Sequence, residues 1–238
     1  MNAPAGLEHC LNFINCHLQP PVGPVSYQQP SEQKQAITLS RQSGCGAHAV
    51  AEKLAAYLQS RNPQAVPPWT IFDRNLVEKV LQDHHLPERL ARFMKEDRVG
   101  EINDIMDELF GLHPSSWVML HQVAETVLRL AEAGNAILVG RGANVITAKL
   151  PHVLHVRLVA SLEHRVEQRQ RFENISRKKA LNSIVREDRG RERYLRKHFG
   201  RDIDDPLLYH LVINTDLVSV DDAASMIGDL AMKRVMSA

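Results

Sequence analysis

The chain has 238 residues, a length that allows one large α/β domain or two small ones with a sizeable buried core. Apolar residues make up 44% and charged residues 24%, which is ordinary for a globular protein. The formal net charge of +1 argues against a protein whose whole surface attracts nucleic acid, so composition predicts no nucleic-acid partner. No run of about 18 apolar residues occurs, and we expect no membrane partner.

The cysteines favour a reduced, cytoplasmic protein. Cys10, Cys16 and Cys45 form no C-x-x-C pair, and one would be left over after any disulfide. The N-terminus has no basic segment followed by an apolar core, so it does not read as a signal peptide. The histidines form no H-E-x-x-H and no Cys/His ligand spacing, and we predict no metal site held by the protein alone.

The N-terminal region reads as an appendage to the main domain. Apolar residues recur at helical spacing within residues 5–18, namely Leu7, Cys10, Leu11, Ile14 and Leu18. A stretch rich in proline and glutamine follows and cannot form regular structure for long. We therefore predict a helix and linker over residues 1–33 and one domain over 34–238. The helix would serve homodimerisation or docking to a partner.

From residue 36 onward, short apolar runs alternate with helical patterns. The runs predict strands at 36–40, 69–72, 136–140, 153–159 and 211–214. The patterns predict helices at 48–60, 74–84, 100–110, 116–133, 162–171, 177–198 and 221–235. Such alternation indicates an α/β fold with a five-stranded parallel sheet and helices on both faces. Ligands of these sheets bind at the carboxyl ends of the strands, so the residues that follow each run are the candidates for a site.

The first strand leads into a glycine turn and a helix, which is how a phosphate-binding loop is built. The loop comprises Ser40, Arg41, Gln42, Ser43, Gly44, Cys45, Gly46, Ala47 and His48. The usual G-x-x-x-x-G-K-[ST] motif places a lysine and a hydroxyl after the last glycine, where this chain has Ala47 and His48. Arg41 occupies the position of the first glycine. Without further context, two glycines here are more often a tight turn than a nucleotide site.

Two other strand ends carry charged residues. Asp73 and Arg74 follow the second strand and could orient a ribose or a phosphate, although these residues alone favour Asp73 as the cap of the next helix. Arg141 stands between two glycines after the third strand. Its planar guanidinium suits bidentate binding of phosphate, and the alternative is a structural arginine paired with a buried carboxylate.

Residues 157–201 are strongly basic, with fourteen Arg or Lys against six Asp or Glu. Within this stretch Arg186, Arg189 and Arg193 recur at a spacing that places them on one face of a helix. A clamp for polyphosphate is one interpretation of this face. A solvated helix with salt bridges, or a nucleic-acid patch, is the other.

These pieces together resemble the cytidylate kinase-like family, a branch of the P-loop nucleoside monophosphate kinases. The resemblance covers roughly residues 36–230 and lies in ordered motifs: ITLSRQSGCG, FDR, ILVGRGANVI, HVRLVASLEHRVE, YLRKHFGRDIDDPLLYHLVINTD and SVDDAASMI. The family loop typically begins Ser-Arg-Gln, so Arg41 is a family trait. The family usually continues with Gly-Gly-Arg, for which His48 is a partial substitute.

The resemblance implies transfer of the γ-phosphoryl group of ATP to CMP or a similar nucleotide, with Mg²⁺ accompanying ATP. By position, the turn at 43–46 would hold the donor phosphates. Arg141 would grip the acceptor phosphate, with Asp73 and Arg74 lining the acceptor side, while Gly142 replaces the aspartate of the family's Gly-Arg-Asp motif. Arg186, Arg189 and Arg193 would belong to a helical, arginine-rich lid in which Asp188 orients an arginine. Arg41 would supply the missing lysine's charge.

Three functions follow as hypotheses. The first is an ATP-dependent kinase acting on CMP or dCMP, favoured by the retained arginines. The second is a non-catalytic sensor of a nucleotide or another phosphorylated ligand, favoured by the missing lysine and the added helix. The third is an RNA-associated protein that uses the basic stretch at 157–201.

Overall fold

A five-stranded parallel sheet forms the centre of the computed structural model, which describes residues 13, 35–73, 102, 104–106, 109 and 118–235. The strands are β1 (Ala36–Arg41), β2 (Thr70–Phe72), β3 (Ala136–Val139), β4 (Val153–Val159) and β5 (Leu211–Asn214), in the order β2-β3-β1-β4-β5. β1 therefore lies in the middle, between β3 and β4. All neighbouring strands run in the same direction, so the loops that follow β1, β3 and β4 meet at one edge.

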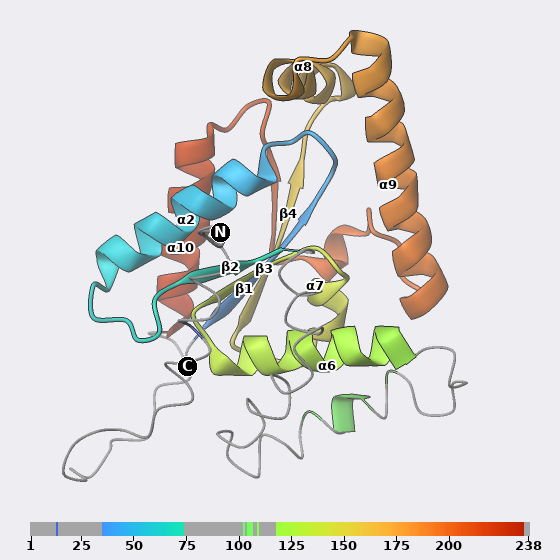
Figure 1. The fold of residues 1–238 in the computed structure, drawn as a ribbon. Coiled ribbons are helices and arrows are strands. Elements are labelled where there is room, and N and C mark those ends of the chain that lie inside the picture. Colours follow the sequence, from blue (N-terminus) through green and yellow to red (C-terminus); the bar gives the residue numbers. More distant parts are fainter. Residues whose placement is uncertain are drawn as a thin grey trace, which may run out of the picture.

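Helices cover both faces of the sheet (Figure 1). Their bounds are α2 (Ala47–Arg61), α6 (Val118–Ala133), α7 (Ala143–Ile146), α8 (Leu162–Glu173), α9 (Arg177–Phe199) and α10 (Val220–Val235), with a 3-10 turn at Pro206–Leu208. Ile37 and Leu39 of β1 pack toward α2 and α10, whereas Ala36 belongs to the core beneath α6 and α7. This alternation is the period of two expected of a strand buried on both faces.

The fold predicted from the sequence is confirmed. Each predicted strand is present to within one residue, and the helices predicted around 48–60, 116–133, 162–171, 177–198 and 221–235 correspond to α2, α6, α8, α9 and α10. The short helix α7 was not anticipated. It begins after Gly142, whose φ of 71° lets the chain turn straight from β3 into a helix.

Some predictions fall on residues outside the described part of the chain. The helix expected at 74–84 is among them, and so are most of the helix at 100–110 and most of the N-terminal helix at 5–18. Phe13 is described: it is helical and fully buried, with its ring 5.1 Å from that of Phe72. This one residue of the N-terminal region therefore packs into the core of the main domain.

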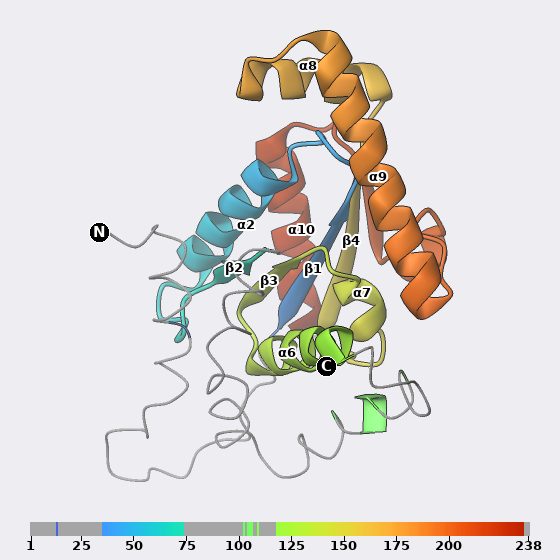
Figure 2. The same ribbon diagram turned by 45° about the vertical axis from the view of Figure 1, so that its right-hand side comes forward.

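The helices α8 and α9 lie beyond and beside the carboxyl ends of the strands (Figures 1 and 2). Each begins with a serine whose hydroxyl accepts a backbone N–H of the first turn, Ser161 for α8 and Ser176 for α9. α9 ends at Gly200, which has a φ of 62°. None of the helices in the described ranges is both long enough and apolar enough to cross a membrane.

Candidate functional site

A cavity of about 580 Å³ opens where β1 and β3 end beneath α9. Its lining comes from the ends of the two strands, from α7 and from α9: Ser40, Arg41, Gly140, Arg141, Gly142, Asn144, Glu187, Gly190, Arg191, Tyr194, Leu195 and Ile203. A smaller cavity of about 220 Å³ adjoins it and shares Arg41, Arg191 and Ile203 with it. This is the edge of the sheet where a ligand was expected.

The loop after β1 is shaped as a phosphate loop. Gly44 and Gly46 have φ angles of 86° and 75°, and a Cβ at Gly44 would lie 2.7 Å from the backbone oxygen of Arg165. Gly46 is the N-cap residue of α2, and it has no side chain to cap the N–H groups of the helix's first turn. The positive end of the α2 dipole therefore lies at this turn.

Two carboxylates of α9 already bind this loop. Asp188 Oδ1 accepts the Ser43 backbone N–H at 2.7 Å, and Glu187 Oε2 accepts the Ser43 hydroxyl at 2.5 Å. An anionic group thus occupies a loop donor of the kind that receives phosphate in a phosphate loop. A ligand phosphate that reaches Ser43 would have to displace at least one of these carboxylates.

Three arginines surround the same two carboxylates. Arg165 donates to Asp188 at 2.5 Å and to the Ser43 carbonyl at 3.2 Å. Arg169 donates to Ser43 Oγ at 2.7 Å and makes a bidentate pair with Glu187, at 3.0 and 2.9 Å. Arg191 bridges Asp188 and Glu187, at 3.0 and 3.3 Å. Three guanidinium groups therefore lie beside a loop that lacks the lysine of the usual motif.

Arg41 extends from the end of β1 over Gly140. A Cβ at Gly140, whose φ is 84°, would overlap the Arg41 guanidinium. Arg41 makes no hydrogen bond or ion pair with the residues that the structure describes. Burial, followed by the charge of Arg191, lowers the pKa of Arg41 to about 10, so the side chain is still a cation at neutral pH. It therefore presents positive charge that no neighbouring carboxylate neutralises by contact.

Two buried donors in the larger cavity lack acceptors. Asn144 is 6% exposed, and its Nδ2 has no hydrogen-bond partner within the described part of the chain. The Tyr194 hydroxyl has none there either, and burial raises the pKa of that phenol. Leaving a buried polar group without a partner costs about 1–3 kcal/mol. Both groups are therefore suited to hydrogen-bond a polar ligand in this cavity.

Gly142 faces the end of α9 instead of a polar ligand group. A Cβ here would lie 2.9 Å from the ring of Phe199 and 3.2 Å from Leu195. The wall at this position is thus apolar, and the aspartate of the family's Gly-Arg-Asp motif would not fit without moving Phe199.

The structure brings several of the predicted site residues together and leaves others apart. Ser40, Arg41 and Arg141 line the larger cavity, and Gln42 and Asp188 line the smaller one. Asp73 lies close enough to Arg41 that its charge partly offsets the lowering of the Arg41 pKa. His48 is exposed on α2 and pairs with Glu52 at 3.2 Å, so it does not line either cavity. Arg74 lies outside the described residues.

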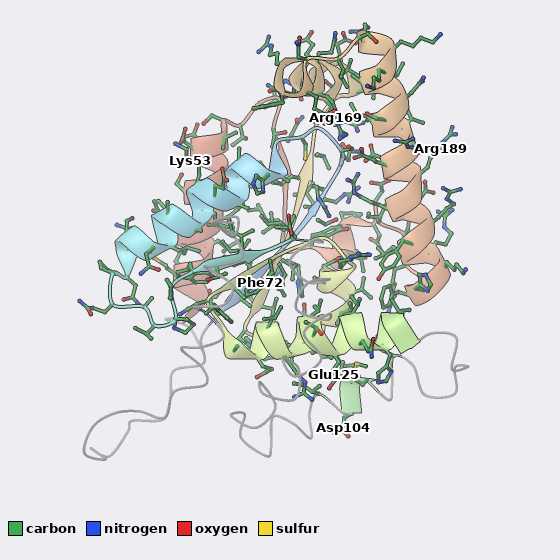
Figure 3. The ribbon with its side chains drawn as sticks, viewed as in Figure 1. Lys53, Phe72, Asp104, Glu125, Arg169 and Arg189 are labelled. Carbon is green, nitrogen blue, oxygen red and sulfur yellow. The ribbon has the colours of Figure 1, made fainter. Side chains whose placement is uncertain are left out.

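The predicted arginine face of α9 points to solvent. Arg186, Arg189 and Arg193 are all exposed, although Arg189 also borders the smaller cavity. Figure 3 shows Arg189 on the outer side of α9, whereas Arg169 lies near the loop after β1. The lid residues that reach the loop are instead Arg165, Arg169, Glu187 and Arg191, as well as the predicted Asp188.

The apolar residues of α9 indicate which of its charged residues face the loop. Ala180, Ile184 and Leu195 are buried and mark the inner face of the helix. Asp188 and Arg191 lie on that face by helical spacing, one turn from Ile184 and from Leu195. Asn144, inside the Gly-Arg-Gly-Ala-Asn motif, had no such signal, because only the short helix α7 turns it into the cavity.

Cys45 fills the turn and is not activated. It is 2% exposed, and its Sγ donates to the Gln42 carbonyl at 3.0 Å. Burial raises the pKa of this thiol to about 11, which outweighs the helix N-terminus beside it.

Comparison with known proteins decides the family. Residues 36–217 match the cytidylate kinase-like family. The chain belongs to this family. Membership supports a kinase-type transferase that uses a nucleotide, and it agrees with a loop, a lid and a cavity at the carboxyl ends of parallel strands.

One solved structure supports the fold, and a second is reported beside it. An uncharacterized protein from Eubacterium ventriosum is 20% identical, with a TM-score of 0.53 over 87% of this chain and 99% of its own. Shikimate kinase from Bacteroides thetaiotaomicron is 12% identical, with a TM-score of 0.45 over 83% of this chain and 98% of its own. At 20% identity, the likeness to the Eubacterium ventriosum protein concerns the fold and not the activity. No curated protein sequence matches the chain.

Proposed function

We propose that the protein transfers the γ-phosphoryl group of ATP to a nucleoside monophosphate, with CMP or dCMP as the first candidates. The observation that carries the proposal is the larger cavity, where Arg41, Arg141 and Arg191 converge from three elements on one space. Guanidinium groups bind phosphate oxygens in a fixed planar geometry, and phosphoryl transfer requires mainly positioning and neutralisation of charge.

The roles follow from position. Arg141 and Arg41 would hold the acceptor phosphate, while the glycine loop and the start of α2 would hold the donor phosphates. Asn144 and Tyr194 would hydrogen-bond the acceptor's sugar or base, because their donors lack partners in the described structure. Beside Gly142 the cavity wall is the apolar ring of Phe199, and no aspartate is present there to bind a sugar hydroxyl. This wall is compatible with an acceptor that carries a deoxyribose.

Mg²⁺ would enter with the phosphates of ATP. No group of three or more potential ligands occurs among the described residues, and arginines already bind the two carboxylates nearest the loop, Glu187 and Asp188. The protein's own residues therefore do not form a cage for the ion, which usually keeps several waters and binds substrate phosphates.

A second candidate is a sensor that binds a nucleotide without turnover. It is favoured by the contacts of Asp188 and Glu187 with Ser43, which occupy loop donors in place of a phosphate. The absence of the motif's lysine also favours a sensor. By analogy with a deleted oxyanion donor, losing such a group removes about 3–4 kcal/mol of transition-state stabilisation.

The test is a coupled assay of ADP release with Mg-ATP and a panel of nucleoside monophosphates. We expect turnover with CMP or dCMP that Arg141→Ala and Arg191→Ala each reduce by about 100-fold. Arg61→Ala, an exposed change on α2, serves as the control. Binding of a nucleotide measured by calorimetry, without turnover of any acceptor, would establish the sensor instead.

A further inference from the structure

The outer face of α9 is a row of positive charge. Nine residues of this helix are exposed: Arg177, Lys178, Lys179, Asn182, Arg186, Arg189, Arg193, Arg196 and Lys197. All except Asn182 are basic, and none is acidic or apolar. From Lys178 onward they fall within a strip about 100° wide at 3.6 residues per turn. We call the seven basic residues from Lys178 to Lys197 in this set the basic stripe.

Most of the basic stripe has no counter-charge. Arg196 pairs with Glu192 at 3.2 Å. The other six residues make no ion pair with any residue that the structure describes. Of the three acids of α9, Glu192 makes that one pair, and Glu187 and Asp188 turn inward to the loop. Like charges at this spacing repel one another, so the stripe is unfavourable unless an anion lies along it.

The dimensions of the stripe suit a polyanion. From Lys179 to Lys197 the helix rises about 27 Å at 1.5 Å per residue. One strand of a nucleic acid carries about eight phosphates over that length, at 3.4 Å each. At the start of the stripe the surface is hollowed, with a depression of about 480 Å³ lined by Ser176, Lys178, Lys179, Asn182, Ser183 and Arg186. Hydroxyl, amide and cationic donors there are those that bind phosphate and sugar.

We propose that the basic stripe of α9 binds the phosphate backbone of a nucleic acid, without reading its sequence. A protein partner fits less well, because protein interfaces have an apolar core and the exposed large apolar side chains of the described structure lie on other elements. Nucleic-acid interfaces are polar and positively charged, as this face is. The overall charge of +1 is no obstacle, since acids of α9 and of other elements balance the stripe without covering it.

The experiment is fluorescence anisotropy with labelled single-stranded RNA, single-stranded DNA and duplex DNA across a range of salt. The test variant is Lys179→Gln/Arg186→Gln/Arg193→Gln, and the matched control is Lys53→Gln/Arg61→Gln/Lys233→Gln, which removes equal charge from α2 and α10. For single strands we expect the wild-type slope of log affinity against log salt to become shallower by about 2 in the test variant. If the two affinities converge at about 1 M salt, this corresponds to roughly 400-fold weaker binding at ~50 mM salt. The control should bind like the wild type.

Four results would overturn the proposal. The first is no wild-type binding at ~50 mM salt, and the second is an equal loss of affinity in the test variant and the control. The third is displacement of the RNA by ATP or CMP, which would place the nucleic acid in the cavity. The fourth is competition by polyglutamate as strong as that by RNA, which would indicate an acidic protein partner. Thermal unfolding of each variant separates loss of binding from loss of fold.

Discussion

At the scale of single residues, Gly140 is the position on which the arrangement of the site most depends. It has a positive φ, and it leaves room for the Arg41 guanidinium, which lies where a side chain would begin. Arg41 in turn lines the larger cavity, where we propose that it holds the acceptor phosphate. A residue with no side chain therefore controls where a catalytic candidate sits.

Replacing Gly140 with alanine should weaken nucleotide binding beyond its effect on stability. The left-handed backbone alone should cost about 1–2 kcal/mol. Displacing Arg41 should also remove a charge-assisted hydrogen bond to the ligand's phosphate. The loss of binding free energy would be about 1.5–3 kcal/mol, or roughly 10- to 100-fold in affinity. Urea unfolding and calorimetric titration with ATP and CMP measure the two effects.

Gly200→Ala is the matched control for Gly140→Ala. Gly200 also has a positive φ, 62°, but a Cβ there meets nothing within 4 Å. Gly200→Ala should therefore lower the free energy of unfolding without weakening the binding of ATP or CMP. Equal affinities for the two variants would mean that Arg41 does not contact the ligand.

At the scale of elements, α9 has two faces with different electrostatic roles. Its inner face docks onto the loop after β1 through Glu187 and Asp188, and Arg165 and Arg169 of α8 hold those carboxylates in place. Its outer face carries the basic stripe. The lid is therefore fastened to the loop by the same kind of contact that a bound phosphate would make.

Asp188→Asn should tighten the binding of ATP. The substitution removes the anion that competes for the Ser43 N–H, and it leaves Arg165 and Arg191 with less negative charge nearby. We expect a gain of about tenfold, or 1.4 kcal/mol, in a calorimetric titration. Glu163→Gln, which removes an exposed acid of α8 paired with Arg177, should leave the affinity unchanged. Weaker binding by Asp188→Asn would show instead that this carboxylate positions the arginines for the phosphate.

At the scale of the whole molecule, a histidine in the sheet makes stability depend on pH. His155 of β4 is 6% exposed, with Nδ1 2.9 Å from Thr38 Oγ1 of β1. Burial, then the neighbouring His210 and Arg234, lower the pKa of His155 to about 3. The unfolded chain therefore binds a proton at this position between about pH 6.5 and 3 that the folded chain does not bind.

The free energy of unfolding should accordingly fall as the pH drops below 6.5. For this group the fall approaches about 1.4 kcal/mol per pH unit. In His155→Gln, which keeps a side chain able to bond Thr38, the slope between pH 6 and 4.5 should be shallower by that amount. His121→Gln, at an exposed position on α6, should keep the wild-type slope. Urea unfolding across this pH range measures both, and parallel slopes for all three proteins would contradict the assignment.

The local pattern of the sequence was enough for the framework. Apolar runs such as 153–159 predicted the strands because burial on both faces leaves few polar residues in a parallel strand. The glycine loop and Arg141 are predicted as site residues because each follows a strand, and parallel strands bring their ends to one edge. The order of the motifs led to the right family.

The choice of side chains within the site depended on tertiary packing. Charge spacing on α9 selected Arg186, Arg189 and Arg193, but a helix orients by the apolar residues it buries, and Ala180, Ile184 and Leu195 turn the opposite face inward. The contacts of Ser43 with Glu187 and Asp188 join residues more than 140 positions apart. No local periodicity encodes such a pairing, because it exists only once the lid is folded over the loop.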